Sequence, residues 1–100
     1  MDRSPTLLEQ VLDTLRAHQD AARALGFELV GVVGSVARGE ARPDSDVDLV
    51  YDVVGEGGLW AFLGLTADIE DQLGRRIDLV DREMMVPDRW LWMSRDLVPL

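Results

Sequence analysis

The sequence contains no cysteine and no lysine, and its single histidine is His18. Without cysteine the chain can form neither disulfides nor thiolate metal sites. Because the P-loop motif GxxxxGK[ST] requires a lysine, a P-loop kinase or NTPase is also excluded. His18 falls outside the apolar stripe of its predicted helix, and we interpret it as a solvated residue, since a site requires converging partners.

Long apolar segments are also missing. No apolar run reaches the ~18 residues that a membrane-spanning helix requires. The N-terminal segment MDRSPTLLEQ lacks the apolar core of a signal peptide. We therefore expect a cytoplasmic protein that does not enter a membrane.

Positive charge is scarce as well. Nineteen acidic residues face ten arginines, which gives a formal net charge of −9. Such a chain repels a phosphate backbone at long range, so we do not expect it to bind nucleic acid directly. An acidic surface suits a divalent cation, a basic protein partner or simple solubility.

The pattern of apolar residues predicts one small α/β domain over residues 1–100. The chain has the length of one domain, and its apolar fraction of 47% favours an ordered core. We predict helix, strand, strand, helix, strand, helix, and hence a small mixed sheet of at least three strands flanked by helices. The predicted elements are helix 5–25, strands 27–33 and 46–53, helix 59–73, strand 77–81 and a last helix around Trp90, Met93 and Leu97.

Two carboxylates in the second predicted strand indicate a metal site. Asp46 and Asp48 are i and i+2 on a strand, so both can point to one face, with Cα atoms ~6.5–7 Å apart. Two such anions repel each other, and a cation between them removes that penalty. Mg²⁺ prefers oxygen ligands and is usually held by one or two carboxylates together with substrate phosphates. With no cysteine and one histidine, an oxygen-only site is the one this chain can build.

The loop before these acids is suited to phosphate. Gly34 and Ser35 end a buried strand and open a turn, where glycine allows close approach of the backbone and serine adds a hydroxyl donor. Gly39 permits a second tight backbone position. A triphosphate could then lie between this loop and a metal on Asp46 and Asp48, and phosphoryl-type transfer needs little beyond positioning and charge neutralisation.

A third carboxylate, Asp78, stands in the third predicted strand among apolar residues that we expect to be buried. A lone buried carboxylate is costly unless it is paired or bound to metal. If this strand lies beside the second one, Asp78 completes a triad and either binds a second metal or accepts a proton. The alternative is a salt bridge to Arg75 or Arg76. Asp81 falls on the opposite strand face, and we interpret it as a strand-end residue.

Taken singly, these signals are weak, because Gly-Ser pairs are common and Asp-x-Asp is often a solvated strand edge or turn. Their combination is much more specific. Gly34-Ser35 followed, after ten residues, by Asp46-x-Asp48 resembles the signature of the DNA polymerase β superfamily of nucleotidyltransferases. The string GSVARGEARPDSDVDL resembles its minimal nucleotidyltransferase (MNT) group. The resemblance is strong over residues 30–52 and weaker around Asp78.

The resemblance implies a polymerase β palm-like fold in which Gly34 and Ser35 bind the triphosphate of ATP and three acids serve as catalytic and metal-binding residues. Those acids are Asp46, Asp48 and Asp78, with Mg²⁺ as the metal. Arg38 and Gly39 complete the residues that we expect to contact the nucleotide.

MNT proteins commonly act as antitoxins beside a HEPN-domain RNase toxin. The resemblance therefore implies transfer of AMP to a tyrosine of such a toxin. Two alternatives stay open: an antitoxin that only binds its toxin, and a nucleotidyltransferase acting on a small-molecule antibiotic. Few residues follow Asp78, so we expect the acceptor to arrive on another molecule. Trp92 is a candidate contact for a partner, or it covers the sheet edge.

Overall fold

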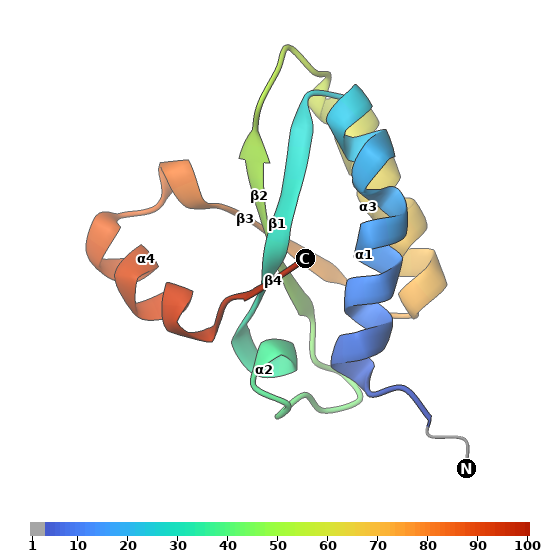
Figure 1. The fold of residues 1–100 in the computed structure, drawn as a ribbon, viewed down its shortest axis with the longest axis vertical. Helices are drawn as coiled ribbons and strands as arrows, with labels where there is room; N and C mark the ends of the chain where they lie inside the picture. The colour runs from blue at the N-terminus through green and yellow to red at the C-terminus, as the bar shows by residue number, and fades with distance from the viewer. Residues whose placement is uncertain (1–3) are drawn as a thin grey trace.

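The computed structural model describes residues 4–100 (Figure 1). Residues 1–3 lie outside the described residues. They are part of the N-terminal segment for which the sequence predicts no signal peptide. The elements are α1 (Leu7–Ala24), β1 (Phe27–Val33), α2 (Gly34–Ala37), β2 (Val47–Val53), α3 (Leu59–Leu73), β3 (Ile77–Asp81), the 3-10 turn η1 (Arg82–Met84), α4 (Pro87–Met93), the 3-10 turn η2 (Ser94–Asp96) and β4 (Val98–Pro99).

The four strands form one mixed sheet in the order β3-β2-β1-β4. Strand β1 runs antiparallel to both β2 and β4, whereas β2 and β3 are parallel. The predicted small mixed sheet is thus confirmed. The sequence did not predict β4, because this strand of two residues is too short to produce an alternating pattern.

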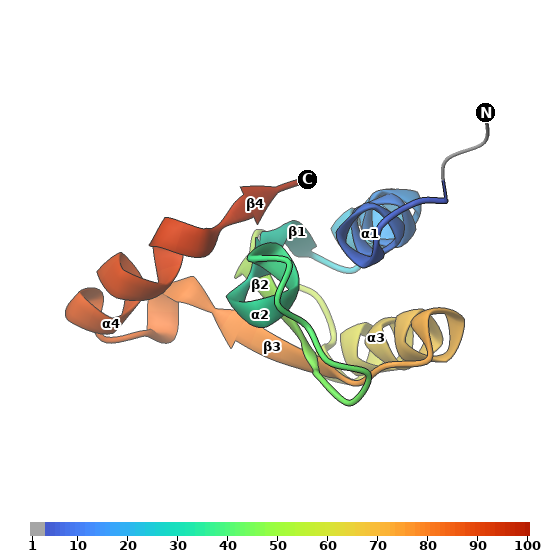
Figure 2. The same ribbon diagram turned by 90° about the horizontal axis from the view of Figure 1, so that it is seen from below.

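Helices α1 and α3 pack together on one face of this sheet, and α4 lies on its other side (Figures 1 and 2). The core between helices and sheet is apolar, and alternate residues of β2 and β3 point into it. The members contributed by these two strands are Val47, Leu49, Tyr51, Ile77 and Leu79. The intervening residues, among them the predicted site acids, belong to the opposite face, which we call the outer face.

Helix α1 begins two residues later than predicted. Thr6 is the N-cap, because its hydroxyl accepts a hydrogen bond from the backbone N–H of Glu9 (3.1 Å) and Glu9 completes a capping box. His18 is half-buried, and its Nε2 lies 3.2 Å from the amide nitrogen of Gln72. That contact joins α1 to α3.

Helix α3 matches its predicted bounds. Phe62, Thr66 and Ile69 form its buried stripe, and Gly74 ends it in the left-handed conformation with φ +65°. The ring of Phe62 stacks on that of Phe27, with centroids 4.1 Å apart. This contact fixes α3 against the start of β1, at the end of the strand that is remote from Gly34. Within residues 4–100, no helix combines the length and apolar character needed to cross a membrane.

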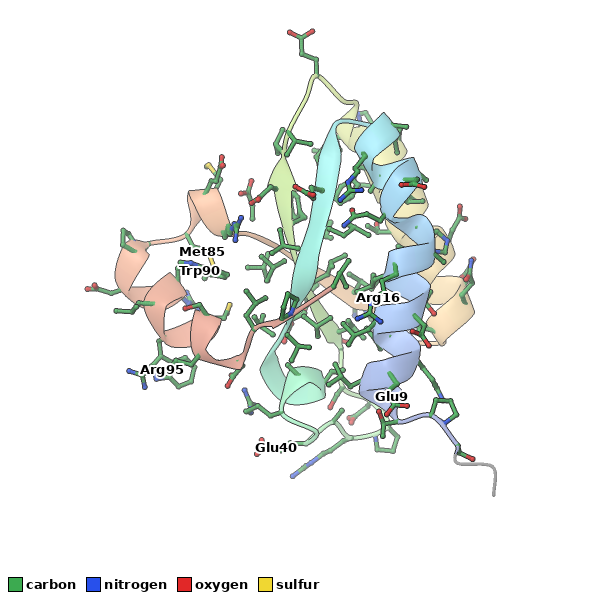
Figure 3. All side chains as sticks on the ribbon, viewed as in Figure 1. Glu9, Arg16, Glu40, Met85, Trp90 and Arg95 are labelled. Carbon is green, nitrogen blue, oxygen red and sulfur yellow. The ribbon has the colours of Figure 1, made fainter. Side chains whose placement is uncertain are left out.

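Two predictions in the C-terminal third are wrong. Strand β3 is not buried: it is an edge strand whose residues are half-buried, and Asp78 is exposed. The last helix does not extend to Leu97, because α4 ends at Met93 and η2 follows. We call residues 82–96 the C-terminal arm. In Figure 3, Met85 and Trp90 lie on the inner side of the arm, while Arg95 points away from the sheet.

Candidate functional site

The loop that joins β1 to β2 begins with a backbone conformation reserved for glycine. Gly34 has φ +80°, which is unfavourable for any residue with a side chain. The chain then makes the short helical turn α2, which begins at Gly34 itself. The N–H of Glu40 donates to the carbonyl of Ser35 (2.8 Å) and folds the loop back on itself. Ser35 is half-buried within this turn.

Gly34 also lies against the carboxylate of Asp48. Val33 and Asp48 are partners in the antiparallel ladder, which brings the end of β1 beside the start of β2. A Cβ added to Gly34 would collide with Oδ2 of Asp48. Glycine is therefore required at position 34 for two reasons. Its φ angle is positive, and a side chain there would collide with the carboxylate of Asp48.

Asp48 and Asp78 lie side by side on neighbouring strands. They are register partners in the parallel β2–β3 ladder, and both belong to the outer face. Neighbouring strands are ~4.8 Å apart, so two carboxylates at the same register position repel each other directly. The third strand thus brings Asp78 next to Asp48, although Asp78 is exposed and not buried as the sequence suggested.

Asp46 stands one residue before β2, so it belongs to the loop end and not to the regular strand. It is half-buried, and the next residue, Val47, is fixed by an N–H that donates to the carbonyl of Arg76 (2.8 Å). Its negative charge helps to raise the pKa of Asp48. The predicted strand boundary was therefore one residue early, while the proximity of the two acids holds.

The electrostatics of Asp48 reflect this crowding. Burial raises the pKa of Asp48 above its ordinary value, and the charges of Asp78 and Asp46 raise it further, whereas Arg38 lowers it. Within residues 4–100, Asp46, Asp48 and Asp78 form no salt bridge. Carboxylates that lie near one another without a cationic partner are an unfavourable arrangement, which a bound cation would relieve.

Arg38 and Gly39 follow α2 at the outer end of the loop. Arg38 is paired with two acids: its Nε donates to Glu40 (3.0 Å) and its Nη1 to Asp96 (2.7 Å). Gly39 has φ +73° and is exposed, with open space where a Cβ would stand. Arg38 lowers the pKa of Asp48, whereas no contact of Gly39 with the acids is found among the described residues.

Two polar residues around the loop were missed by sequence reasoning. Arg75, considered above as a partner for Asp78, instead donates from Nη1 to the carbonyls of Arg42 (2.8 Å) and Ser45 (3.0 Å). It thereby braces the segment that leads into Asp46. Asp96 holds Arg38 from the far end of the chain. No local pattern could have revealed either contact, because both join residues at least 30 positions apart.

The donor set is suited to a hard cation. The acids near the loop offer carboxylate oxygens only, which is the chemistry that Mg²⁺ prefers. Among residues 4–100, no three acidic or histidine side chains are gathered tightly enough to form a ready-made metal site.

A small mixed sheet that carries a Gly-Ser loop beside acids on two adjacent strands defines a nucleotide-handling domain, and comparison with known proteins identifies its class. Residues 15–93 match the nucleotidyltransferase domain family, so the chain belongs to this family and is a nucleotidyltransferase. It is 42% identical over 74 residues to the protein adenylyltransferase MntA of Thermococcus cleftensis, covering 73% of this chain and 75% of that protein.

The fold has a close solved counterpart. A structure described as that of a proposed minimal nucleotidyltransferase superposes with a TM-score of 0.67 at 39% sequence identity, covering 89% of this chain and 95% of the other. The expected MNT domain and its fold are thereby confirmed.

Proposed function

We propose that this protein transfers AMP from ATP to a protein acceptor, a tyrosine of a partner HEPN RNase toxin, and so acts as an antitoxin. The observation that carries the proposal is the register pairing of Asp48 with Asp78 beside the glycine that opens the loop. The similarity to a protein adenylyltransferase supports the choice of AMP and of a protein acceptor.

In this proposal the loop binds the nucleotide and the acids hold the metal. The backbone at Gly34 and the hydroxyl of Ser35 bind the triphosphate, with Arg38 and Gly39 at the loop's outer end. Asp46, Asp48 and Asp78 would hold Mg²⁺, and their unpaired, oxygen-only donor set fits that ion. When bound, Mg²⁺ supplies positive charge that offsets both the acids and the polyphosphate.

The reaction transfers an adenylyl group. The acceptor hydroxyl oxygen forms a bond to the α-phosphorus of ATP, the bond from that phosphorus to the bridging α–β oxygen breaks, and pyrophosphate leaves. The proton of the hydroxyl must pass to a base, and the exposed carboxylate of Asp78 is the candidate. The protein's own contribution is to hold the two reactants in line, which requires a rigid loop and a fixed strand register.

The C-terminal arm is the candidate contact for the partner. Four large apolar side chains of the arm are well exposed, namely Met84, Val86, Leu91 and Trp92. Aromatic anchors are enriched at interface hot spots. Trp92 is 65% exposed, so in this structure it does not cover the sheet edge. A body with a net charge of −9 would attract a basic partner.

The test is to combine the purified protein with ATP, Mg²⁺ and the product of the neighbouring gene, and to weigh both proteins by mass spectrometry. We expect AMP on a tyrosine of the partner and none when Asp48→Asn replaces the parent. A functional toxin that gains no AMP would refute the proposal. If Asp48→Asn still neutralises the toxin, the antitoxin acts by binding alone.

A further inference from the structure

Arg38 is held by two acids that come from different parts of the chain. Glu40 belongs to the same loop, lies at its exposed edge (Figure 3) and is 65% exposed as a side chain. Asp96 is 58 residues away in sequence, and its side chain is 22% exposed. The Asp96 contact is the shorter of the two, 2.7 Å against 3.0 Å. Asp96 is therefore the closer and less exposed partner of Arg38.

The position of Asp96 is itself fixed by the sheet. Two residues after it, Val98 pairs with Val32 of β1, the strand that leads directly into Gly34. The N–H of Leu100 donates to the carbonyl of Val30 (3.1 Å) and extends this attachment. The segment after the C-terminal arm thus returns to the edge of the sheet, and Asp96, the last residue of the arm, contacts the loop through Arg38.

The guanidinium of Arg38 retains a free nitrogen in this arrangement. Nε donates to Glu40 and Nη1 to Asp96, whereas Nη2 has no hydrogen bond to residues 4–100. Arg38 is also tied to the site through its backbone N–H, which donates to the carbonyl of Gly34 (3.1 Å), the glycine that lies against the carboxylate of Asp48. Its positive charge is thus held beside the acids, with donor capacity remaining for an anion.

We propose that Asp96 is a positioning residue, which fixes the guanidinium of Arg38 so that it binds a phosphate oxygen of the nucleotide. The inference rests on the proposed function of the loop. Salt bridges at this level of exposure contribute little to stability, so the effect of Asp96 should appear in nucleotide binding. The opposite role, in which Asp96 withholds Arg38 from the nucleotide, predicts tighter binding once Asp96 is removed.

The experiment is a double-mutant cycle on ATP affinity. Dissociation constants for ATP are measured by calorimetry, in Mg²⁺ and in EDTA, for the parent, Asp96→Ala, Arg38→Ala and the double variant. We expect Asp96→Ala and Arg38→Ala each to weaken binding about tenfold, the loss typical of one charge-assisted hydrogen bond. The double variant should bind no more weakly than Arg38→Ala alone, because Asp96 acts through Arg38.

Two further variants separate positioning from a general structural effect. Asp96→Glu should recover most of the affinity, since it restores the carboxylate. Glu28→Gln breaks the Arg23–Glu28 salt bridge of 3.0 Å, remote from the loop, and should leave the affinity unchanged. In turnover assays, Asp96→Ala should raise KM for ATP more than it lowers kcat.

Several outcomes would overturn the inference. These are an unchanged or improved affinity in Asp96→Ala, or additive losses in the double variant. If the parent binds ATP and modifies its partner but Asp96→Ala binds equally well, the inference fails alone. If the parent protein binds no ATP, both this inference and the proposed function fail.

Discussion

Strand β2 carries two aspartates on its outer face, and the molecule treats them in opposite ways. Asp52 accepts two hydrogen bonds from Arg82, at 2.8 Å from Nε and 2.6 Å from Nη2, in a bidentate pair. Asp48, near the other end of the same strand, pairs in register with Asp78 and has no salt bridge within the described chain. We call the Asp52 end of this strand face the compensated end, because an arginine balances its negative charge. We call the Asp48 end the uncompensated end, because no salt bridge balances its charge.

The contrast supports the proposed role of Asp48 in the site and a structural role for Asp52. A carboxylate that is half-buried beside like charges destabilises the folded protein, and such groups concentrate at sites that bind cations or substrates. Ten arginines are available in the chain, yet Asp46, Asp48 and Asp78 have none as a salt-bridge partner in residues 4–100. The comparison can be tested by replacing aspartate with asparagine at each end of the strand face, at Asp48 and at Asp52.

The largest expected effect is on catalysis. Asp48→Asn should reduce nucleotidyl transfer by about a hundredfold or more, since under the proposed function it removes a carboxylate that holds Mg²⁺. Asp52→Asn makes the identical change at the compensated end and should retain activity per folded molecule. Transfer of label from α-labelled ATP to the partner protein measures both. Comparable losses in the two variants would abolish the distinction between the ends.

The next effect concerns the glycine that makes room for Asp48. Gly34→Ala introduces a Cβ that collides with the Asp48 carboxylate, and a displacement of about 1 Å in a site can cost about a hundredfold in rate. Gly74→Ala is the matched control, because Gly74 also has positive φ (+65°) but open space around it. It should lose about 1 kcal/mol of stability from backbone strain and keep its activity. Equal loss of activity in both variants would show that strain alone is responsible.

The comparison also separates what the sequence could predict from what it could not. The bounds of β1 and β3 were predicted as observed, because short β-branched runs between glycine and charged residues are local signals. The pairing of Asp48 with Asp78 was conditional on strand order, which periodicity does not encode. Apolar runs in edge and central strands look alike, so β3 was wrongly predicted to be buried.

Long-range polar contacts were beyond prediction for a related reason. Arg38 and Arg75 are surrounded in sequence by residues of both charge signs, so local pattern gives neither a unique partner. Their partners are set by how β4 and the end of α3 pack against the loop. Residue types alone therefore predicted that Asp48 and Asp78 could meet, but not the contacts that hold Arg38 and Arg75 in place.

A smaller effect, opposite in sign at the two ends, is expected on stability without metal. Asp52→Asn weakens the pair with Arg82 and should cost about 1 kcal/mol, or about 4–8 °C in melting temperature for a domain of this size. Asp48→Asn removes repulsion from Asp78 and Asp46 and should raise the melting temperature by a few degrees. Thermal unfolding in EDTA measures both. Added Mg²⁺ and ATP should stabilise the parent but not Asp48→Asn.

The smallest expected effect is a pH dependence that belongs to Asp48 alone. Its pKa is raised in the folded state above the ordinary value of 3.8, so the folded protein binds this proton more tightly than the unfolded chain does. Below pH 3.8 the group is protonated in both states and causes no loss. As the pH rises from there through the folded-state pKa, the unfolded chain loses the proton first, and the free energy of unfolding falls.

Asp48→Asn should remove this decline, because its amide does not titrate, whereas Asp52→Asn should leave it in place. The measurement is the difference in free energy of unfolding between each variant and the parent, from urea titrations in EDTA between pH 3.5 and about pH 7. For Asp48→Asn the difference should grow in favour of the variant as the pH rises. A difference that stays constant across this range would mean that burial and the neighbouring acids do not raise the pKa of Asp48. The proposed function of the uncompensated end would then lose its electrostatic support.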